Sequence, residues 1–253
     1  MRAVERALED ERFAGLVQAY RADQYPGSAD GQGERAAESI RLTTDLAEAV
    51  ADADLVIEAV PETPEIKTST YERLAEVAPE KTIFATNSST MLPSSFMEAT
   101  GRPEKFLALH FANHIWRLNT AEVMGTSKTD PAVFDEIVEF AEAIRMVPIK
   151  VLKEQPGYVL NSLLVPFLNA GAGLLVGGVA DVETIDRTWR IATGAPMGPF
   201  QIYDVVGLNT AYNISSANPA PAAQAFARLL KEQYIDQGKL GRATGEGFYT
   251  YDA

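Results

Sequence analysis

Short apolar runs alternate with capped or amphipathic stretches through the first three-fifths of the chain. The apolar runs lie at 55–60, 82–85, 106–109, 121–124 and 147–151. Short runs of this kind, bounded by turn and helix signals, are typical of buried strands. Thr63-Pro64 and Asp130-Pro131 are typical helix starts, because each places a capping residue before a proline. Strands that alternate with helices predict an α/β fold with a mostly parallel, doubly wound sheet.

The segments around these runs carry weaker signals. Residues 1–20 have apolar residues at near-helical spacing, which predicts an amphipathic helix. Residues 21–33 carry Pro, Gly, Ser and Asp and are expected to form an exposed loop. We expect a short strand at 40–43, followed by a short helix that Thr44 caps. Another short helix is expected after Pro93.

The pattern changes at Gln155-Pro156-Gly157, beyond which helical signals dominate. The first is the apolar stretch 158–176, which is nineteen residues long. Its polar residues, Asn161 among them, favour a buried core or interface helix over a membrane span. Further helices are expected after Asp181 and at Pro199. We therefore predict an α/β domain at 1–153 and an all-helical domain at 154–253.

Composition narrows the class of protein. The net charge is −13 and the pI about 4.7, so no basic surface is expected for nucleic acid or an anionic membrane. The chain has no cysteine, which excludes disulfides, thiolate metal sites and a cysteine nucleophile. We expect no metal site. The absence of cysteine, signal peptide and long apolar run favours a cytoplasmic address.

One of only two histidines follows an apolar run. His110 comes directly after 106–109, and Glu122 lies twelve residues further on. A carboxylate on one imidazole nitrogen fixes the tautomer and stabilises the imidazolium, which makes a general base. Ligands of parallel sheets bind at the carboxyl ends of the strands. Residues 60–62, residues 87–89 and His110 all lie at such ends, so we expect these segments to meet.

Ser89 and Asn161 could hold a substrate oxygen in line with that base. Spacing alone leaves simpler interpretations open: a satisfied strand-end His110, a solvated Glu122, an Asn161 bonded across a helix interface, a solvated Lys67 and a polar turn at 87–90. Acyl-transfer chemistry is disfavoured, because no Gly-x-Ser-x-Gly turn is present.

Several motifs together are similar to those of one enzyme family. They are DLVIEAVPET at 54–63, FATNSS at 84–89, LHFAN at 109–113, AEVMG at 121–125, QPGYVLNSLLVP at 155–166, GAPMGPFQIYDVVGL at 194–208 and ATGEGFYTY at 243–251. In this order and spacing the chain resembles the short-chain L-3-hydroxyacyl-CoA dehydrogenases. The resemblance extends from about Leu42 to the end of the chain.

The resemblance implies an oxidoreductase that oxidises the 3-hydroxyl of an acyl-CoA thioester and passes hydride to NAD. His110 matches the family's catalytic base and Glu122 its orienting carboxylate. Ser89 and Asn161 match residues that position substrate and base, and Asn113 matches one beside the substrate. The positions that match the cofactor site are Glu62, Lys67, Asn87 and Ser89. The resemblance also implies a homodimer formed through the helical domain.

The chain departs from the family pattern in two places. His114 stands where the family usually has proline, which bears on loop shape and acyl-chain preference. The family's opening strand and Gly-x-Gly-x-x-Gly turn, which hold the dinucleotide pyrophosphate, have no counterpart; Gly31-Gln32-Gly33 follows no predicted strand. The resemblance therefore implies an incomplete Rossmann-like sheet with an apolar edge at 55–60. A fragment, a late start, a dimerised edge or a refolded substitute would each account for this.

Three functional interpretations follow. The first is the NAD-dependent 3-hydroxyacyl-CoA dehydrogenase, with NAD or NADP and the acyl length left open. The second is a cofactor-less protein that binds acyl-CoA or only dimerises, because the pyrophosphate turn is absent; this predicts poor NAD binding. The third is a dehydrogenase of free hydroxy acids or gulonate on a related fold, in which Trp116-Arg117 would meet a carboxylate.

Overall fold

The computed structural model describes residues 40–113, 115 and 118–251, which form two compact units. The first unit ends at Val159 and the second begins at Leu160. The expected helix at 1–20, the loop at 21–33, His114 and Trp116-Arg117 lie outside the described residues.

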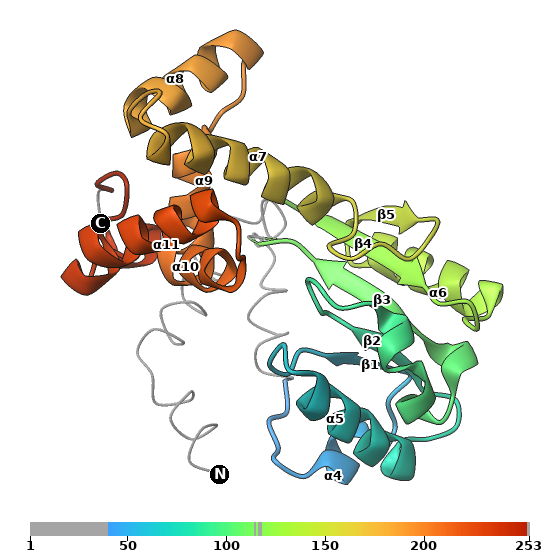
Figure 1. Cartoon of the computed structure of the whole chain (residues 1–253). Helices are drawn as coiled ribbons and strands as arrows, with labels where there is room; N and C mark the ends of the chain where they lie inside the picture. The colour runs from blue at the N-terminus through green and yellow to red at the C-terminus, as the bar shows by residue number, and fades with distance from the viewer. Residues whose placement is uncertain (1–39, 114, 116–117, 252–253) are drawn as a thin grey trace. The chain divides into compact units, whose positions relative to one another are not determined.

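A five-stranded sheet forms the centre of the first unit (Figure 1). Its strands, in spatial order, are β1 (Leu55–Glu58), β2 (Ile83–Thr86), β3 (Phe106–Phe111), β4 (Thr120–Gly125) and β5 (Val147–Val151). All neighbours are parallel except β3 and β4. Only eight residues join these two strands, too few for the crossover that a parallel pair requires. The sheet is therefore mixed and mostly parallel, which confirms the predicted α/β class.

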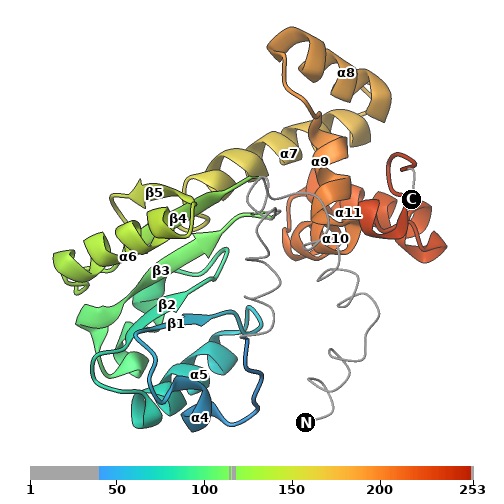
Figure 2. The same cartoon turned by 180° about the vertical axis from the view of Figure 1, so that it is seen from behind.

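Helices cover both faces of this sheet (Figures 1 and 2). They are α4 (Leu46–Val50), α5 (Pro64–Val77) and α6 (Pro131–Ala143). Alternate residues of β3 face opposite layers: Leu107 and Leu109 pack with α6, whereas Phe106 packs with Tyr71 of α5. Burial on both faces explains why the three central strands, β2, β3 and β4, are continuous apolar runs. His110 shares the parity of Phe106, so its side chain is on the face opposite α6.

Three expectations for the first unit are wrong in detail. Residues 40–43 form no strand, because among the described residues no strand pairs with them, and Ile40 is exposed. Asp45 rather than Thr44 caps α4, because its carboxylate accepts the amide of Glu48 at 3.1 Å. The helix expected after Pro93 is three short 3-10 turns: η2 (Pro93–Ser95), η3 (Met97–Thr100) and η4 (Pro103–Lys105).

The second unit is helical, as predicted. Its elements are α7 (Leu160–Val176), α8 (Val182–Thr193), α9 (Pro199–Val206), α10 (Leu208–Ala217), α11 (Pro221–Gln233), η5 (Ile235–Gln237) and η6 (Arg242–Thr244). Phe200, Tyr203 and Phe226 lie in its core. The first helix begins two residues later than expected, because Gly157 and Tyr158 have φ values of 77° and 55°. No helix among the described residues is long and apolar enough to cross a membrane.

Two buried aspartates fasten the C-terminal segment to this core. Asp186 accepts the amide of Phe200, at the start of α9, and the hydroxyl of Tyr249. Asp204 accepts the amides of Phe248 and Tyr249 at 2.8 and 3.0 Å. A Cβ at Gly247 would overlap the Asp204 carboxylate. The glycine and aromatic residues of the C-terminal motif therefore have a structural role in the second unit.

Candidate active site

A buried imidazole–carboxylate pair lies between β3 and β4. The antiparallel register places His110 directly opposite Glu122, and the two side chains project from the same face. The distance between His110 Nδ1 and Glu122 Oε2 is 2.9 Å, and both residues are less than 5% exposed. A carboxylate can only accept here, so Nδ1 donates and Nε2 is the nitrogen that can take a proton.

The carboxyl ends of the first three strands meet beside this pair, as predicted. Asn87, just past β2, accepts the amide of Phe111 on β3 through Oδ1, at 2.9 Å. Glu62, past β1, accepts the Ser88 hydroxyl at 2.8 Å and the Ser89 amide at 3.1 Å. These bonds cross between separate strand–loop segments, and they give the loops at the sheet edge a defined shape.

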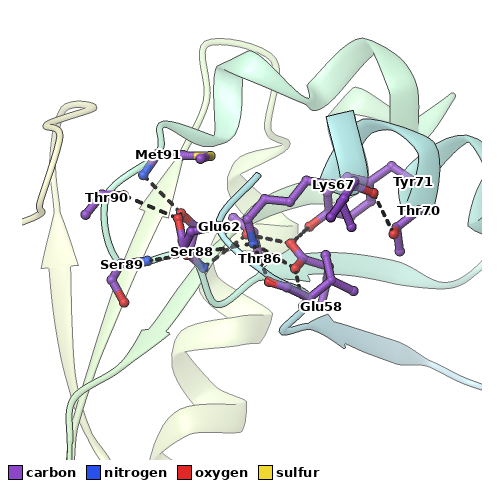
Figure 3. A network of polar contacts seen from close by, with 12 residues as sticks. Glu58, Glu62, Lys67, Thr70, Tyr71, Thr86, Ser88, Ser89, Thr90 and Met91 are labelled. Carbon is purple, nitrogen blue, oxygen red and sulfur yellow. Dashed lines mark hydrogen bonds and ion pairs between the residues drawn. The ribbon is translucent and has the colours of Figure 1, made fainter. Parts of the chain in front are cut away.

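A second buried charge pair supports the loop that carries Glu62 (Figure 3). Lys67 of α5 is 1% exposed, so its interpretation as a solvated helix residue is wrong. Its Nζ lies 2.8 Å from Glu58 Oε1, and 3.8 Å from Glu62 Oε1. Lys67 therefore links a carboxylate at the end of β1 to the carboxylate of the loop that follows.

Glu58 is a residue that the sequence interpretation missed. Besides Lys67, its carboxylate accepts the Val60 amide at 2.7 Å and the Tyr71 and Thr86 hydroxyls, each at 2.9 Å (Figure 3). Burial, and then the charge of Glu58, raise the pKa of Tyr71, so that hydroxyl stays a donor. A carboxylate inside the apolar run 55–60 was the available signal, because a buried charge needs partners.

The remaining predicted residues are less enclosed. Ser89 is half-buried in the loop after β2, and Asn113 is exposed just past β3. Asn161 lies in the first turn of α7 and belongs to the second unit. The roles of these three residues, like those of His110 and Glu122, stay predictions.

Tyr158 is the other residue that the sequence interpretation missed. Its ring stacks on the imidazole of His110, with centroids 4.7 Å apart and planes 16° apart. The sequence placed Tyr158 at the start of a helix, where its side chain would have had no defined neighbour. The preceding Gly157 was the only available signal that the backbone turns there.

Family comparisons agree with the motif resemblance. The family model described as "3-hydroxyacyl-CoA dehydrogenase, NAD binding domain" matches residues 3–155. The model of the same family's C-terminal domain matches residues 157–251. A mitochondrial hydroxyacyl-coenzyme A dehydrogenase of Sus scrofa is 36% identical over 234 residues, which cover 89% of this chain and 73% of the relative. A 3-hydroxybutyryl-CoA dehydrogenase of Clostridioides difficile is 34% identical over 203 residues, covering 79% and 72%.

Among solved structures, one described as a diketoreductase that acts on dicarbonyl compounds is 63% identical, with a TM-score of 0.90. The match covers 95% of this chain and 84% of that one. The fold and both units are thus shared with enzymes whose named substrates differ.

Proposed function

The chain belongs to the 3-hydroxyacyl-CoA dehydrogenase family, and from that premise we propose that it oxidises the 3-hydroxyl of a 3-hydroxyacyl-CoA to the ketone. The buried His110–Glu122 pair, with 2.9 Å between Nδ1 and Oε2, is the observation that supports this best. It supplies an oriented base at the edge of the sheet where ligands of α/β proteins bind.

The proposed chemistry separates a proton from a hydride. His110 Nε2 takes the proton of the 3-hydroxyl, and Glu122 stabilises the imidazolium through Nδ1–H. Ser89 and Asn161 hold the substrate oxygen, with Asn113 beside the acyl group. The chemistry that NAD would supply when bound is an acceptor for the hydride that leaves the carbon bearing the hydroxyl.

The described residues fit one part of that cofactor. The Glu62 side chain is 41% exposed, so its carboxylate can accept ribose hydroxyls, while Lys67 balances its charge. Asn87 and Ser89 complete the proposed set around the nicotinamide end. Gly31-Gln32-Gly33 lies outside the described residues. The family's NAD-binding domain matches from residue 3 to residue 155, which favours the enzyme over the cofactor-less alternative.

The test is oxidation of 3-hydroxybutyryl-CoA, followed by NADH absorbance. Replacing His110 by Gln removes the base, so we expect kcat to fall by about 10²- to 10⁴-fold. The control is Lys81→Met, because Lys81 lies on the surface, in an exposed salt bridge with Asp54. If the wild type turns over the substrate and the Gln variant retains the same kcat, the result contradicts His110 as the base.

Calorimetric titration of NAD tests the cofactor-less alternative. That alternative requires acyl-CoA binding without NAD binding or turnover. Saturable NAD binding together with turnover would exclude it.

A second candidate is the reduction of free dicarbonyl compounds. The 63% identity to the diketoreductase favours it, and the same pair would then return a proton to the product alkoxide. Rates with an acyl-CoA thioester, the matching free hydroxy acid and a diketo ester distinguish the candidates, including the free-acid alternative. If kcat/KM for the diketo ester exceeds that for the thioester by about tenfold or more, the assigned function becomes the reduction of free dicarbonyl compounds.

The proposal includes a homodimer formed through the helical unit. Exposed apolar side chains on α7 and α8 include Leu163, Leu174, Trp189 and Ile191. Leu174 and Trp189 also line an apolar groove of about 430 Å³. Apolar surface of this kind is typical of protein interfaces. We expect Ile191→Glu, at a 77% exposed site, to give monomers by sedimentation, and Ile40→Glu on the first unit to leave the dimer intact. A monomeric wild type would contradict the dimer.

A cytoplasmic address stays part of the proposal. The matched relative of Sus scrofa is named as a mitochondrial enzyme. Fractionation of the producing cell, with this chain detected by antibody, would decide between the two compartments.

A further inference from the structure

Tyr158 has an unusual backbone for a large residue. Its φ is 55°, in the left-handed region that favours glycine, and it is fully buried. Residues held in such conformations persist only where surrounding contacts enforce them, and they concentrate at functional sites. The contacts that Tyr158 makes therefore indicate what the conformation serves.

The ring of Tyr158 covers one face of the His110 imidazole. The centroids are 4.7 Å apart and the planes differ by 16°, which is a stacked arrangement. The hydrogen bond to Glu122 restrains Nδ1, but a bond at one nitrogen leaves the ring free to tilt about that direction. The stacked ring removes this freedom and excludes water from that face.

The hydroxyl of Tyr158 reaches a different part of the site. It donates to the backbone carbonyl of Ser88 at 2.7 Å. Burial, followed by the charges of Glu122, Glu62 and Glu58, raises the pKa of Tyr158, so the O–H stays protonated and can donate. The bond fixes the peptide that leads into Ser89.

The neighbouring peptide holds the second member of the pair. The amide of Val159 donates to Glu122 Oε1 at 2.9 Å, while Glu122 Oε2 holds His110. The left-handed turn at Gly157 and Tyr158 thus presents an aromatic face, a hydroxyl and an amide to three parts of one site.

We propose that Tyr158 is a positioning residue for the dehydrogenase reaction, fixing the plane of His110 by stacking and the Ser88–Ser89 peptide through its hydroxyl. The inference rests on the proposed function, in which His110 is the base and Ser89 holds the substrate. It assigns separable effects to the two ends of one side chain. The ring governs proton transfer, and the hydroxyl governs how the substrate is held.

Two variants separate these effects. Tyr158→Phe keeps the ring, so we expect kcat within about twofold of the wild type and a substrate KM raised about three- to tenfold, the effect of one lost hydrogen bond. Tyr158→Leu also removes the stack, so kcat should fall about 10- to 100-fold, as expected for a misplaced base. The KM for NAD should change less than about twofold in both.

Tyr203→Phe is the matched control, because Tyr203 is a buried tyrosine in the core of the second unit. It should leave both kinetic constants as in the wild type. Equal kcat in wild type and Tyr158→Leu would overturn the role of the ring. An unchanged substrate KM in Tyr158→Phe would overturn the role of the hydroxyl. If the Leu variant does not fold, the Phe variant tests the role of the hydroxyl, and the upfield position of the His110 ring protons in the wild type tests the stack.

Proton NMR of the free protein tests the stack without any turnover. The chain has two histidines, so the His110 ring protons are assigned by their disappearance in His110→Gln. A ring stacked at 4.7 Å shifts protons above its face upfield, and we expect Tyr158→Leu to cancel that shift while Tyr158→Phe keeps it. Identical His110 shifts in wild type and Tyr158→Leu would overturn the proposal. If the shift is present but no substrate turns over, the proposed function fails while the contact stands.

Discussion

At the scale of single residues, the register of two strands decides what His110 can do. Glu122 accepts the hydrogen bond from Nδ1 because it is the direct cross-strand partner of His110. Both side chains are buried, so little water competes for that bond and its geometry is defined. The same carboxylate is held from its other oxygen by the Val159 amide. A base of this kind depends on its partner as much as on the imidazole.

Replacing Glu122 by Gln tests that dependence. The amide nitrogen of Gln can donate to Nδ1, which favours the tautomer with the proton on Nε2, and it cannot stabilise an imidazolium. We expect kcat to fall by about 10²- to 10⁴-fold, with a smaller change in substrate KM. Stopped-flow or steady-state NADH formation measures it. A variant with wild-type kcat would show that Glu122 has only a structural role.

At the scale of elements, β1 and α5 are joined by a buried ion pair. Lys67 and Glu58 are each 1% exposed at the side chain, and hydroxyls of Tyr71 and Thr86 complete the carboxylate's partners. Removing the counter-ion of a buried charge destabilises the folded protein, because the remaining charge is left in the interior without compensation. The pair therefore fixes how α5 sits on the end of β1, where the loop with Glu62 begins.

Lys67→Met should destabilise the protein by about 3–5 kcal/mol, because it leaves the Glu58 charge buried without its cation. Lys81→Met is the matched control: Lys81 pairs with Asp54 at 2.6 Å, but its side chain is 56% exposed. That surface pair should contribute less than about 1 kcal/mol. Urea unfolding of the two variants measures the contrast. Similar losses in both would contradict the argument.

At the scale of the whole molecule, each unit has its own core and its own buried polar groups. In the second unit, burial raises the pKa of Asp204, and the charge of Asp186 adds to the effect, although three hydrogen bonds oppose it. Folding thus transfers a carboxylate into an environment that favours its protonated form. The C-terminal segment is attached through that group.

The sign of the resulting pH dependence is fixed. Above the ordinary pKa of 3.8 and up to the raised pKa, folded Asp204 holds more protons than unfolded Asp204. Its contribution to the free energy of unfolding therefore falls as pH rises through that window. The wild type minus Asp204→Asn difference, from urea unfolding, should be larger near about pH 4 than near about pH 7. A difference that grows with pH would contradict the assignment.

The sequence by itself determined the elements and most of their ends. Apolar runs bounded by Pro, Gly and capping residues located the strands, because local sterics and burial act within a few residues; Asp130 and Asp181 cap their helices as expected. The sequence pattern also predicted that His110 lies at the end of a strand. The prediction of a strand at 40–43 was wrong, because a strand needs a neighbouring strand to pair with and a local sequence pattern does not supply one.

Only the tertiary structure decided which side chains meet. The pairing of His110 with Glu122 depends on strand register, and the burial of Lys67 depends on Glu58 at the end of a different element. The stack of Tyr158 on His110 depends on a left-handed turn forty-eight residues away along the chain. Such contacts are set by packing between distant segments, and the chemistry of this site is built from them.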